Sequence, residues 1–197
     1  YLNREGLQIE QYLVGFLMVK CVMEQRGCLL DLDTLLTILD VFKNMCCKQI
    51  IANNKNVMTF YSGAVAISYR LYIELDFQNN QYEPFWFQLI ESSDPCDWYF
   101  GLNLMNEIIG AMKKPLKHMT EMEQKKLQSE FQKFHLARYF RAANNVLQKN
   151  WEIKENDDLI VDSSLKLILG CLNFIPALDI DKFHFFIPPN MLEFYKG

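Results

Sequence analysis

Glycine and proline are scarce in this sequence, with only 8 Gly and 6 Pro among 197 residues. Sandwiches and barrels built on tight turns need more of both, because these residues supply the backbone angles of turns. Long apolar runs are also lacking, since charged residues such as Lys20, Lys43 and Arg70 interrupt the candidate helices, and we expect no membrane insertion. The chain instead has 50% hydrophobic residues, with 15 Phe, 9 Tyr and 9 Met, which suits helices packed around a large core.

Basic residues do not dominate either, and the chain carries a net charge of −4. A general nucleic-acid binder needs a surplus of Lys and Arg on one face, so we expect no direct contact with nucleic acid and favour a basic protein partner. The six cysteines show no CxxC spacing, and most fall on predicted apolar helix faces. We therefore expect reduced core thiols at Cys21, Cys28, Cys46, Cys47, Cys96 and Cys171.

No catalytic motif is present. GxGxxG, GxxxxGK[ST] and GxSxG are missing, and no carboxylate pair is predicted to share an apolar-lined face with a histidine or a second acid. The scattered histidines argue against a zinc site, and Asp31, Asp33 and Asp40 lack the spacing of a calcium loop. We expect no enzyme, cofactor or metal. A helical enzyme completed by further segments is the least favoured alternative.

The strongest pattern lies between Cys96 and Met112. Apolar residues there are spaced four, three, four and three apart, and a second stripe runs beside the first; the two stripes are Trp98, Leu102, Met105, Ile109, Met112 and Phe100, Leu104, Ile108. Both spacings place the residues on helical faces, so this helix is predicted to be covered on two sides. Asn103, Asn106 and Glu107 form its narrow polar edge. Such helices belong to a bundle core or to the inner row of a helical stack.

The same spacing recurs before and after this helix, at Phe60, Ala64, Ile67 and Leu71 and at Val161, Leu165, Ile168, Leu172 and Ile175. Weaker helices lie between the strong ones. This alternation predicts an all-α fold of stacked antiparallel helix pairs, near the armadillo or HEAT class. The predicted helices span residues 7–25, 34–51, 56–77, 82–92, 96–112, 121–132, 134–150 and 157–174.

Several local features are predicted within these helices. The first helix is expected to bury Leu13, Phe16, Leu17, Cys21 and Val22 and to end at Gly27. Asp33 is expected to cap the second helix, and Thr120 with Glu123 has the form of a capping box. A kink is expected near Lys133. For Arg70 the interpretations that stay open are a stem on the core with its head in water, and contact with a partner or with a neighbouring acid.

From about Val57 onward the chain resembles the amino-terminal part of the importin-β (karyopherin-β) superfamily, nearest to exportins of the exportin-7 kind. The resemblance rests on the strings YFGLNLMNEIIGAM, KLQSEFQKFHLARYFRAANNVL and LKLILGCLNFIP, and on the later IPP segment at Ile187–Pro189. It implies a right-handed α-solenoid of HEAT-like pairs over residues 1–197. Residues 1–27 would hold the inner helix of an early repeat, and residues 31–78, 81–113 and 120–175 three successive repeats. Residues 176–197, whose apolar residues lack a partner within the chain, would start the next repeat.

The resemblance also implies a function. Members of this family are monomeric nuclear transport receptors that shuttle between nucleus and cytoplasm, pass nucleoporins in the pore, and bind protein cargo and the GTP-loaded GTPase Ran. The alternative is a HEAT or armadillo scaffold with no Ran preference. In either case exposed inner-helix positions are the predicted partner-binding residues: Arg4, Gln8, Gln11, Arg70, Glu74, Asn103, Asn106, Glu107, Asp162 and Lys166.

Overall fold

The computed structural model describes residues 8–45, 51, 53–75, 82–153 and 157–174. These residues form helices and short connections and contain no strand, which confirms the predicted all-α class. The elements are α1 (Ile9–Arg26), the 3₁₀ helix η1 (Gly27–Leu29), α2 (Leu32–Met45), α4 (Lys55–Leu75), α5 (Glu83–Glu91), α6 (Pro95–Lys113), α7 (Glu121–Phe131), the π-helix η2 (Gln132–Leu136), α8 (Ala137–Ile153) and α9 (Asp158–Leu172).

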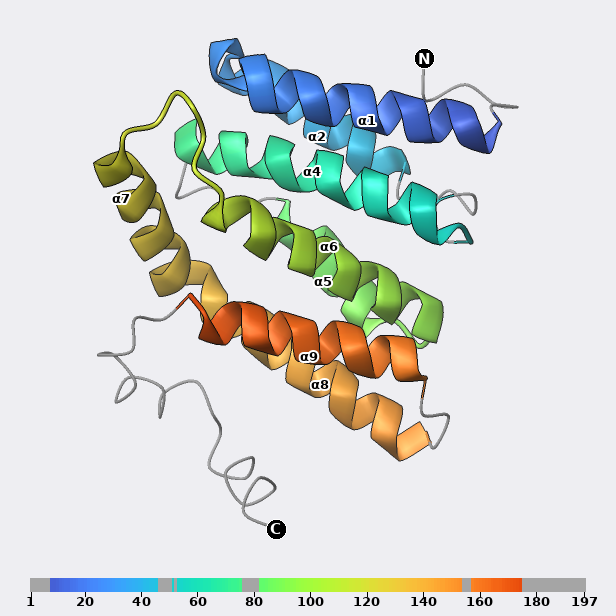
Figure 1. The fold of residues 1–197 in the computed structure, drawn as a ribbon. Helices are drawn as coiled ribbons and strands as arrows, with labels where there is room; N and C mark the ends of the chain where they lie inside the picture. Colours follow the sequence, from blue (N-terminus) through green and yellow to red (C-terminus); the bar gives the residue numbers. More distant parts are fainter. Residues whose placement is uncertain (1–7, 46–50, 52, 76–81, 154–156, 175–197) are drawn as a thin grey trace.

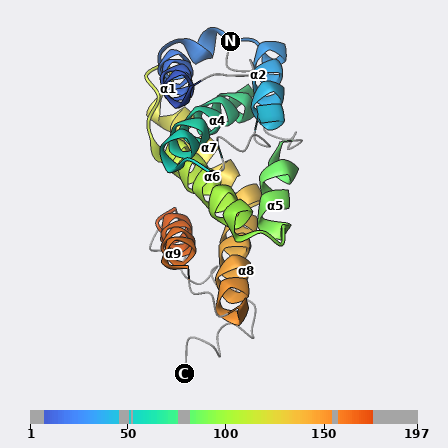
Figure 2. The same ribbon diagram turned by 90° about the vertical axis from the view of Figure 1, so that its right-hand side faces the viewer.

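The helices are arranged in two rows (Figures 1 and 2). In the first row α4 packs between α1 and α6, and α6 packs between α4 and α9. In the second row α2 packs on α4, α5 on α6 and α8 on α9. These three pairs are the ones predicted from the sequence. Helix α7 and η2 cross from the end of α6 to α8 and so stand outside both rows.

Polar side chains begin several helices. Asp94 accepts a hydrogen bond from the Cys96 N–H at 2.8 Å and starts α6. The predicted capping box is confirmed, because the side chains of Thr120 and Glu123 each accept from the other's backbone N–H. The predicted cap of α2 is wrong: Asp31 accepts from the Thr34 N–H at 2.8 Å, so the cap lies two residues before Asp33.

Helix α6 is buried as predicted. Every residue of its two apolar stripes has at most 3% of its surface exposed. Neighbours on three sides explain this, since α4 and α9 flank α6 in the row and α5 covers its back. Gly101 allows the close approach of α5, because a Cβ at this position would lie 2.8 Å from Ile90 Cδ1.

The stripe predicted for α1 is wrong in part. Phe16 is buried, but Leu17, Cys21 and Val22 are exposed, and Tyr12 and Met23 lie in the core in their place. The reason is the position of α1 at the end of the row. Within the described chain, α4 is the helix against which it mainly packs, so only one of its two apolar sides is covered.

Helix α9, at the other end of the row, departs from its predicted stripe in the same way. Ile168 is buried as expected, but Leu165 is 46% exposed, and Val161 and Leu172 are only half-buried. The buried face is turned toward α6 and α8 and consists of Ile160, Ser164, Leu167, Ile168 and Cys171. The last predicted stripe residue, Ile175, lies outside the described residues.

The described cysteines are free thiols, as expected, but their predicted core position is mostly wrong. Cys21, Cys28 and Cys96 are exposed free thiols, and only Cys171 is buried. Cys21 lies on the side of α1 that no described helix covers. Its place on an apolar helical face therefore did not bury it. Cys46 and Cys47 lie outside the described residues.

The predicted kink near Lys133 corresponds to η2, where the helix widens to a π-helix between α7 and α8. Buried charges accompany it. Glu83 is fully buried at the start of α5 and lies 2.6 Å from His135 Nδ1 and 2.5 Å from Arg138 Nη1. These contacts tie the junction between α7 and α8 to the preceding helix pair.

Gly27 ends α1 as predicted, but for a different reason from a left-handed cap. Its φ is −59°, which any residue adopts. A Cβ at Gly27 would lie 2.2 Å from Leu71 Cδ1, so the absence of a side chain lets η1 pass over α4.

Candidate functional site

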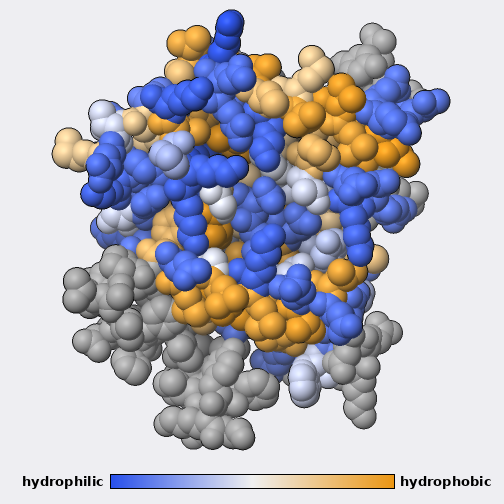
Figure 3. Space-filling view, in the orientation of Figure 1, coloured by the Kyte–Doolittle hydropathy of each residue, from blue (hydrophilic) through white to orange (hydrophobic). Residues whose placement is uncertain are grey.

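The exposed side of the first row, which we call the row face, combines side chains from α1, α4, α6 and α9. Figure 3 shows this face: hydrophilic side chains cross its middle, and apolar areas lie toward its upper and lower parts. Both end helices of this row carry exposed apolar residues, such as Leu17 of α1 and Leu169 of α9. The predicted partner-binding residues were placed on this row of helices.

A cavity of about 290 Å³ opens on the row face where α1, α4 and α6 meet. We call it the row-face hollow. Small residues in the middle of two helices create it, because Gly63 and Ala66 of α4 and Gly110 and Ala111 of α6 leave space that larger side chains would fill. At Gly110 nothing lies within 4 Å of a would-be Cβ. The complete lining is Lys20, Glu24, Gly63, Ala66, Ile67, Glu107, Gly110, Ala111, Lys114, Pro115, Leu116 and Lys117.

Charges of both signs surround this hollow. Lys20, Lys114 and Lys117 stand against Glu24 and Glu107, and none of these five forms an ion pair among the residues that the structure describes. The ammonium group of Lys20 reaches over α4 to within 3.0 Å of where a Cβ of Gly63 would lie. Charges that are not satisfied internally are available to a partner, where they favour the correct register and encounter rate.

Arg70 lies next to this hollow, but it is not an exposed row-face residue. Its side chain is 0% exposed, so the head is not in water and is not exposed to a partner. The expected contact with a neighbouring acid is confirmed, because Arg70 Nε lies 3.2 Å from Glu74 Oε1. The guanidinium donates to the backbone carbonyls of Ala111 and Lys114 and, at 2.5 Å, to Gln124 Oε1. Burial lowers the pKa of Arg70, and the nearby Glu74 carboxylate opposes that shift.

The segment 114–120 explains this burial. Arg70 follows Gly63 and Ala66 on α4 at spacings of three and four, so its helix position does belong to the row face. The connection from α6 to α7 covers it, and the guanidinium hydrogen bonds hold that connection in place. Periodicity identified the correct side of α4 but carried no information about the covering connection.

Glu74, one turn beyond Arg70, is also engaged inside the molecule. Its Oε1 atom lies 3.2 Å from Arg70 Nε and its Oε2 atom 3.0 Å from His118 Nε2. Its side chain is 12% exposed. The prediction that Arg70 and Glu74 are exposed positions is therefore wrong for both, because together they anchor the 114–120 connection.

The remaining predicted residues have different surroundings. Glu107 lines the row-face hollow, and Asn103 is half-buried on the same helix. Asn106 is committed to α9, since its Nδ2 donates to the Ser163 carbonyl at 3.0 Å. Asp162 and Lys166 are exposed on α9, away from the hollow lining. Gln8 and Gln11 are exposed but cap the start of α1, and Arg4 lies outside the described residues.

Sequence reasoning missed most of the hollow. Lys20, Glu24, Lys114 and Lys117 were not selected. Lys114 and Lys117 follow the end of α6, where lysines complement the helix dipole and need no partner to explain them. A usable signal was present in the two glycines in the middle of strongly apolar helices, Gly63 and Gly110. Glycine costs helix stability at such positions and often marks a close approach or an opening.

Comparisons of the chain with protein-family models, with curated proteins and with solved structures find no match. None of the described helices combines the length and the apolar character that crossing a bilayer demands. Within the described part of the chain, no three His, Cys, Asp or Glu side chains come together in a group that could hold a metal ion. The row-face hollow, with charges of both signs around its opening, is the candidate site considered below.

Proposed function

We propose that this chain is a protein-recognition module built as a right-handed α-solenoid of HEAT-like helix pairs, with the row face as its inner, partner-binding side. Residues 1–197 form one such unit in this proposal, and the module acts without catalysis. Stacked helix pairs present long surfaces of this kind because each pair adds one helix to a continuous wall.

One observation carries the proposal: the row-face hollow is open although the helices around it are tightly packed. Gly101 on α6 is filled to contact by Ile90, whereas Gly110 on the same helix faces empty space. Unpaired Lys and Glu side chains ring that space. Packing of the apolar core does not require such an opening, whereas a protruding side chain of a partner could fill it.

Within this class, an exportin-like nuclear transport receptor is the specific candidate. The sequence resemblance supports it, and so does the net charge of −4, since acidic receptors suit a basic surface on GTP-loaded Ran. The proposal then includes protein cargo and nucleoporins as further partners and movement between nucleus and cytoplasm.

A Ran-independent scaffold is the second candidate, and the charges at the hollow favour it. Three lysines and two glutamates surround the opening. That mixture is less acidic than the whole chain, so the hollow by itself suits a partner surface with charges of both signs. The two candidates predict different nucleotide dependence and the same location of the binding surface.

Binding to purified Ran separates the candidates. The chain is immobilised and tested against Ran locked with a non-hydrolysable GTP analogue and against Ran loaded with GDP. Preference for the GTP form supports the transport receptor; equal or absent binding to both forms removes it and leaves the scaffold.

A substitution that fills the row-face hollow tests whether the partner binds there. Gly110→Trp places a large side chain where nothing lies within 4 Å of the Cβ, so the fold is expected to tolerate it while the partner is displaced. Ser129→Trp, on an exposed position of α7 outside the hollow, is the matched control. Loss of binding in the first variant alone supports the proposal; equal binding by both variants contradicts the row-face location.

A further inference from the structure

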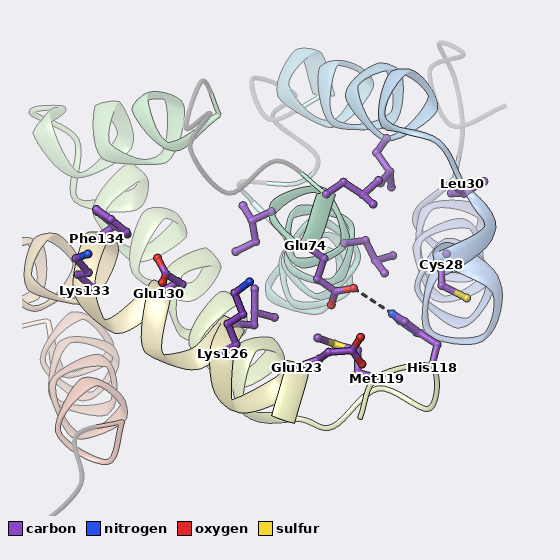
Figure 4. A pocket seen from close by; sticks show the side chains of 16 residues that line it. Cys28, Leu30, Glu74, His118, Met119, Glu123, Lys126, Glu130, Lys133 and Phe134 are labelled. Carbon is purple, nitrogen blue, oxygen red and sulfur yellow. Dashed lines mark hydrogen bonds and ion pairs between the residues drawn. The ribbon is translucent and has the colours of Figure 1, made fainter. Parts of the chain in front are cut away.

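A second and larger cavity, of about 660 Å³, lies on the other side of the 114–120 connection. We call it the α7 groove. Its walls come from α7 and η2 on one side and from η1 and the start of α2 on the other, with the C-terminal end of α4 between them (Figure 4). His118 and Met119 contribute to it, whereas Lys114 to Lys117 line the row-face hollow. Arg70 and the connection that it anchors therefore separate the two cavities.

Four charged residues follow one another along the α7 wall with alternating sign. Glu123, Lys126 and Glu130 are spaced three and four residues apart, so they share one side of α7. Lys133 follows three residues later in η2 and lines the same groove. Figure 4 shows their side chains on the side of α7 that faces Glu74 and Leu30. The groove thus has a wall with a defined charge order.

The central pair of this line does not close on itself. Lys126 and Glu130 are four residues apart, yet they form no ion pair among the residues that the structure describes. On a different face of α7, Glu121 and Lys125 have the same spacing and do pair, at 2.6 Å. Lys126 and Glu130 are therefore left for a ligand, although the helix geometry permits their internal pairing. At the ends of the line, Glu123 accepts hydrogen bonds from Thr120, and the Lys133 ammonium lies 4.7 Å from the centre of the Phe134 ring.

Apolar side chains lie beside this charged wall. Leu75, the last residue of α4, is 56% exposed, Phe134 is 50% exposed, and Leu30 is half-buried on the opposite wall. Leu127, Leu71 and Ile73 lie beneath them in the core. An apolar floor beside a line of charges is the pattern that an amphipathic helix matches, with its apolar stripe on the floor and its flanking charges on the wall.

We propose that the α7 groove binds an amphipathic helix of a partner protein, whose flank carries acidic and basic residues in the alternating order opposite to Glu123, Lys126, Glu130 and Lys133. The occupant lies alongside α7, with apolar side chains at helical spacing against Leu75 and Phe134. This site is distinct from the row face, and its existence does not depend on the function proposed for that face.

The charge order is tested with two synthetic helical peptides of identical composition. Both carry the same leucine stripe and a fluorescent label. On the flank, spaced three, four and three apart, one has the alternating order Glu, Lys, Glu, Lys and the other the block order Glu, Glu, Lys, Lys. In either orientation the block peptide meets two like charges on the wall. Anisotropy titration of the full chain at low salt should therefore give about tenfold tighter binding of the alternating peptide.

The double variant Lys126→Glu with Glu130→Lys converts the wall itself to the block order without changing its net charge. Lys126 is exposed and Glu130 half-buried on α7, and neither belongs to the core, so circular dichroism should show an unchanged fold. The preference is expected to reverse in favour of the block peptide. Equal binding of the two peptides by the unaltered chain, or a preference that the double variant leaves unchanged, overturns the proposal.

The apolar floor is tested with two lysine substitutions at equally exposed leucines. Leu75→Lys, at 56% exposure in the groove, should abolish binding of the alternating peptide, whereas Leu169→Lys, at 57% exposure on α9, should leave it within twofold of the unaltered chain. Equal loss in both variants, or no loss in Leu75→Lys, shows that the peptide binds elsewhere and overturns the proposal. Gly110→Trp should leave peptide binding intact, which separates this test from that of the row face.

Discussion

Helices α6 and α1 belong to the same row, have similar lengths and carry apolar residues on two sides, yet they differ in how much of that surface is covered. Both stripes of α6 are buried between α4, α9 and α5. On α1 the side toward α4 is buried, and the opposite side, with Val14, Met18 and Val22, is exposed. The comparison teaches that an apolar stripe reports a surface able to pack, and that the neighbours decide whether it does.

The sharpest test of this difference compares two arginines. Arg70→Met removes the buried guanidinium that holds the carbonyls of Ala111 and Lys114 in the row interior. The unfolding free energy should fall by about 3–5 kcal/mol, because those groups and Glu74 lose their partner. Arg26→Met, at the exposed end of α1, should change it little. Urea denaturation measures both, and equal effects would contradict the burial assigned to Arg70.

Two leucines test the same difference with identical chemistry. Leu104 of α6 is 0% exposed and Leu17 of α1 is 45% exposed. Leu104→Ala should cost about 2–5 kcal/mol of unfolding free energy, since it leaves a cavity in the core. For Leu17→Ala the loss should be at most about 0.5 kcal/mol, as for other surface changes. If Leu17→Ala were as costly, its side of α1 would be covered.

Alanine substitutions at two glycines of α6 test the packing on two of its sides. Gly101 lies toward α5 and Gly110 toward the row-face hollow. Gly101→Ala puts a Cβ 2.8 Å from Ile90 Cδ1 and 3.2 Å from Leu89 Cβ, so we expect a loss of about 1–2 kcal/mol in stability. Gly110→Ala meets nothing within 4 Å and should gain about 0.5–1 kcal/mol, because alanine favours the helix. Thermal unfolding gives both signs, and a destabilised Gly110→Ala would show that the hollow is filled.

The cysteine thiols test the same comparison with the smallest expected effect on stability near neutral pH. At pH 8 Ellman's reagent should modify the exposed Cys21 of α1 at once and Cys171 of α9 only when the protein unfolds. Burial raises the pKa of Cys171 from 9.0 to about 12, so its folded thiol stays neutral where the unfolded one ionises. Its contribution to stability is therefore complete below pH 9 and is lost as the pH rises toward 12. Cys171→Ala should flatten that loss, and rapid labelling of Cys171 in the folded chain would contradict its burial.

The sequence predicted the helices well, because long apolar periodicities leave few alternatives. The pairs of helices seen in the structure match the repeats that the family resemblance implied. Both stripes of α6 and the capping box at Thr120 were identified from spacing alone. The faces of α1 and α9 were not, since each end helix has two apolar sides and periodicity does not tell which one finds a neighbour. Asp31 and Asp33 both carry a carboxylate that can cap a helix. The sequence therefore did not show that Asp31, and not the predicted Asp33, caps α2.

The candidate site was predicted only in part. Glu107 was selected from the polar edge of α6 and does line the row-face hollow. Arg70 and Glu74 were assigned to the correct side of α4 but are held beneath the 114–120 connection. That connection has no periodicity, so its path over α4 depends on contacts that the sequence does not reveal: the hydrogen bond from Arg70 to the Lys114 carbonyl and the contact between His118 and Glu74. The lysines that it places at the hollow were missed for the same reason.

The central claim is that the row face around the hollow is where a partner protein binds, and lysine footprinting tests it most directly. The chain is acetylated with and without GTP-loaded Ran, and each lysine is quantified by mass spectrometry. We predict that Lys20, Lys114 and Lys117 become protected, while Lys125, which is exposed on α7 outside the hollow, stays reactive. Stable binding of Ran with unchanged reactivity at all three hollow lysines would contradict the account.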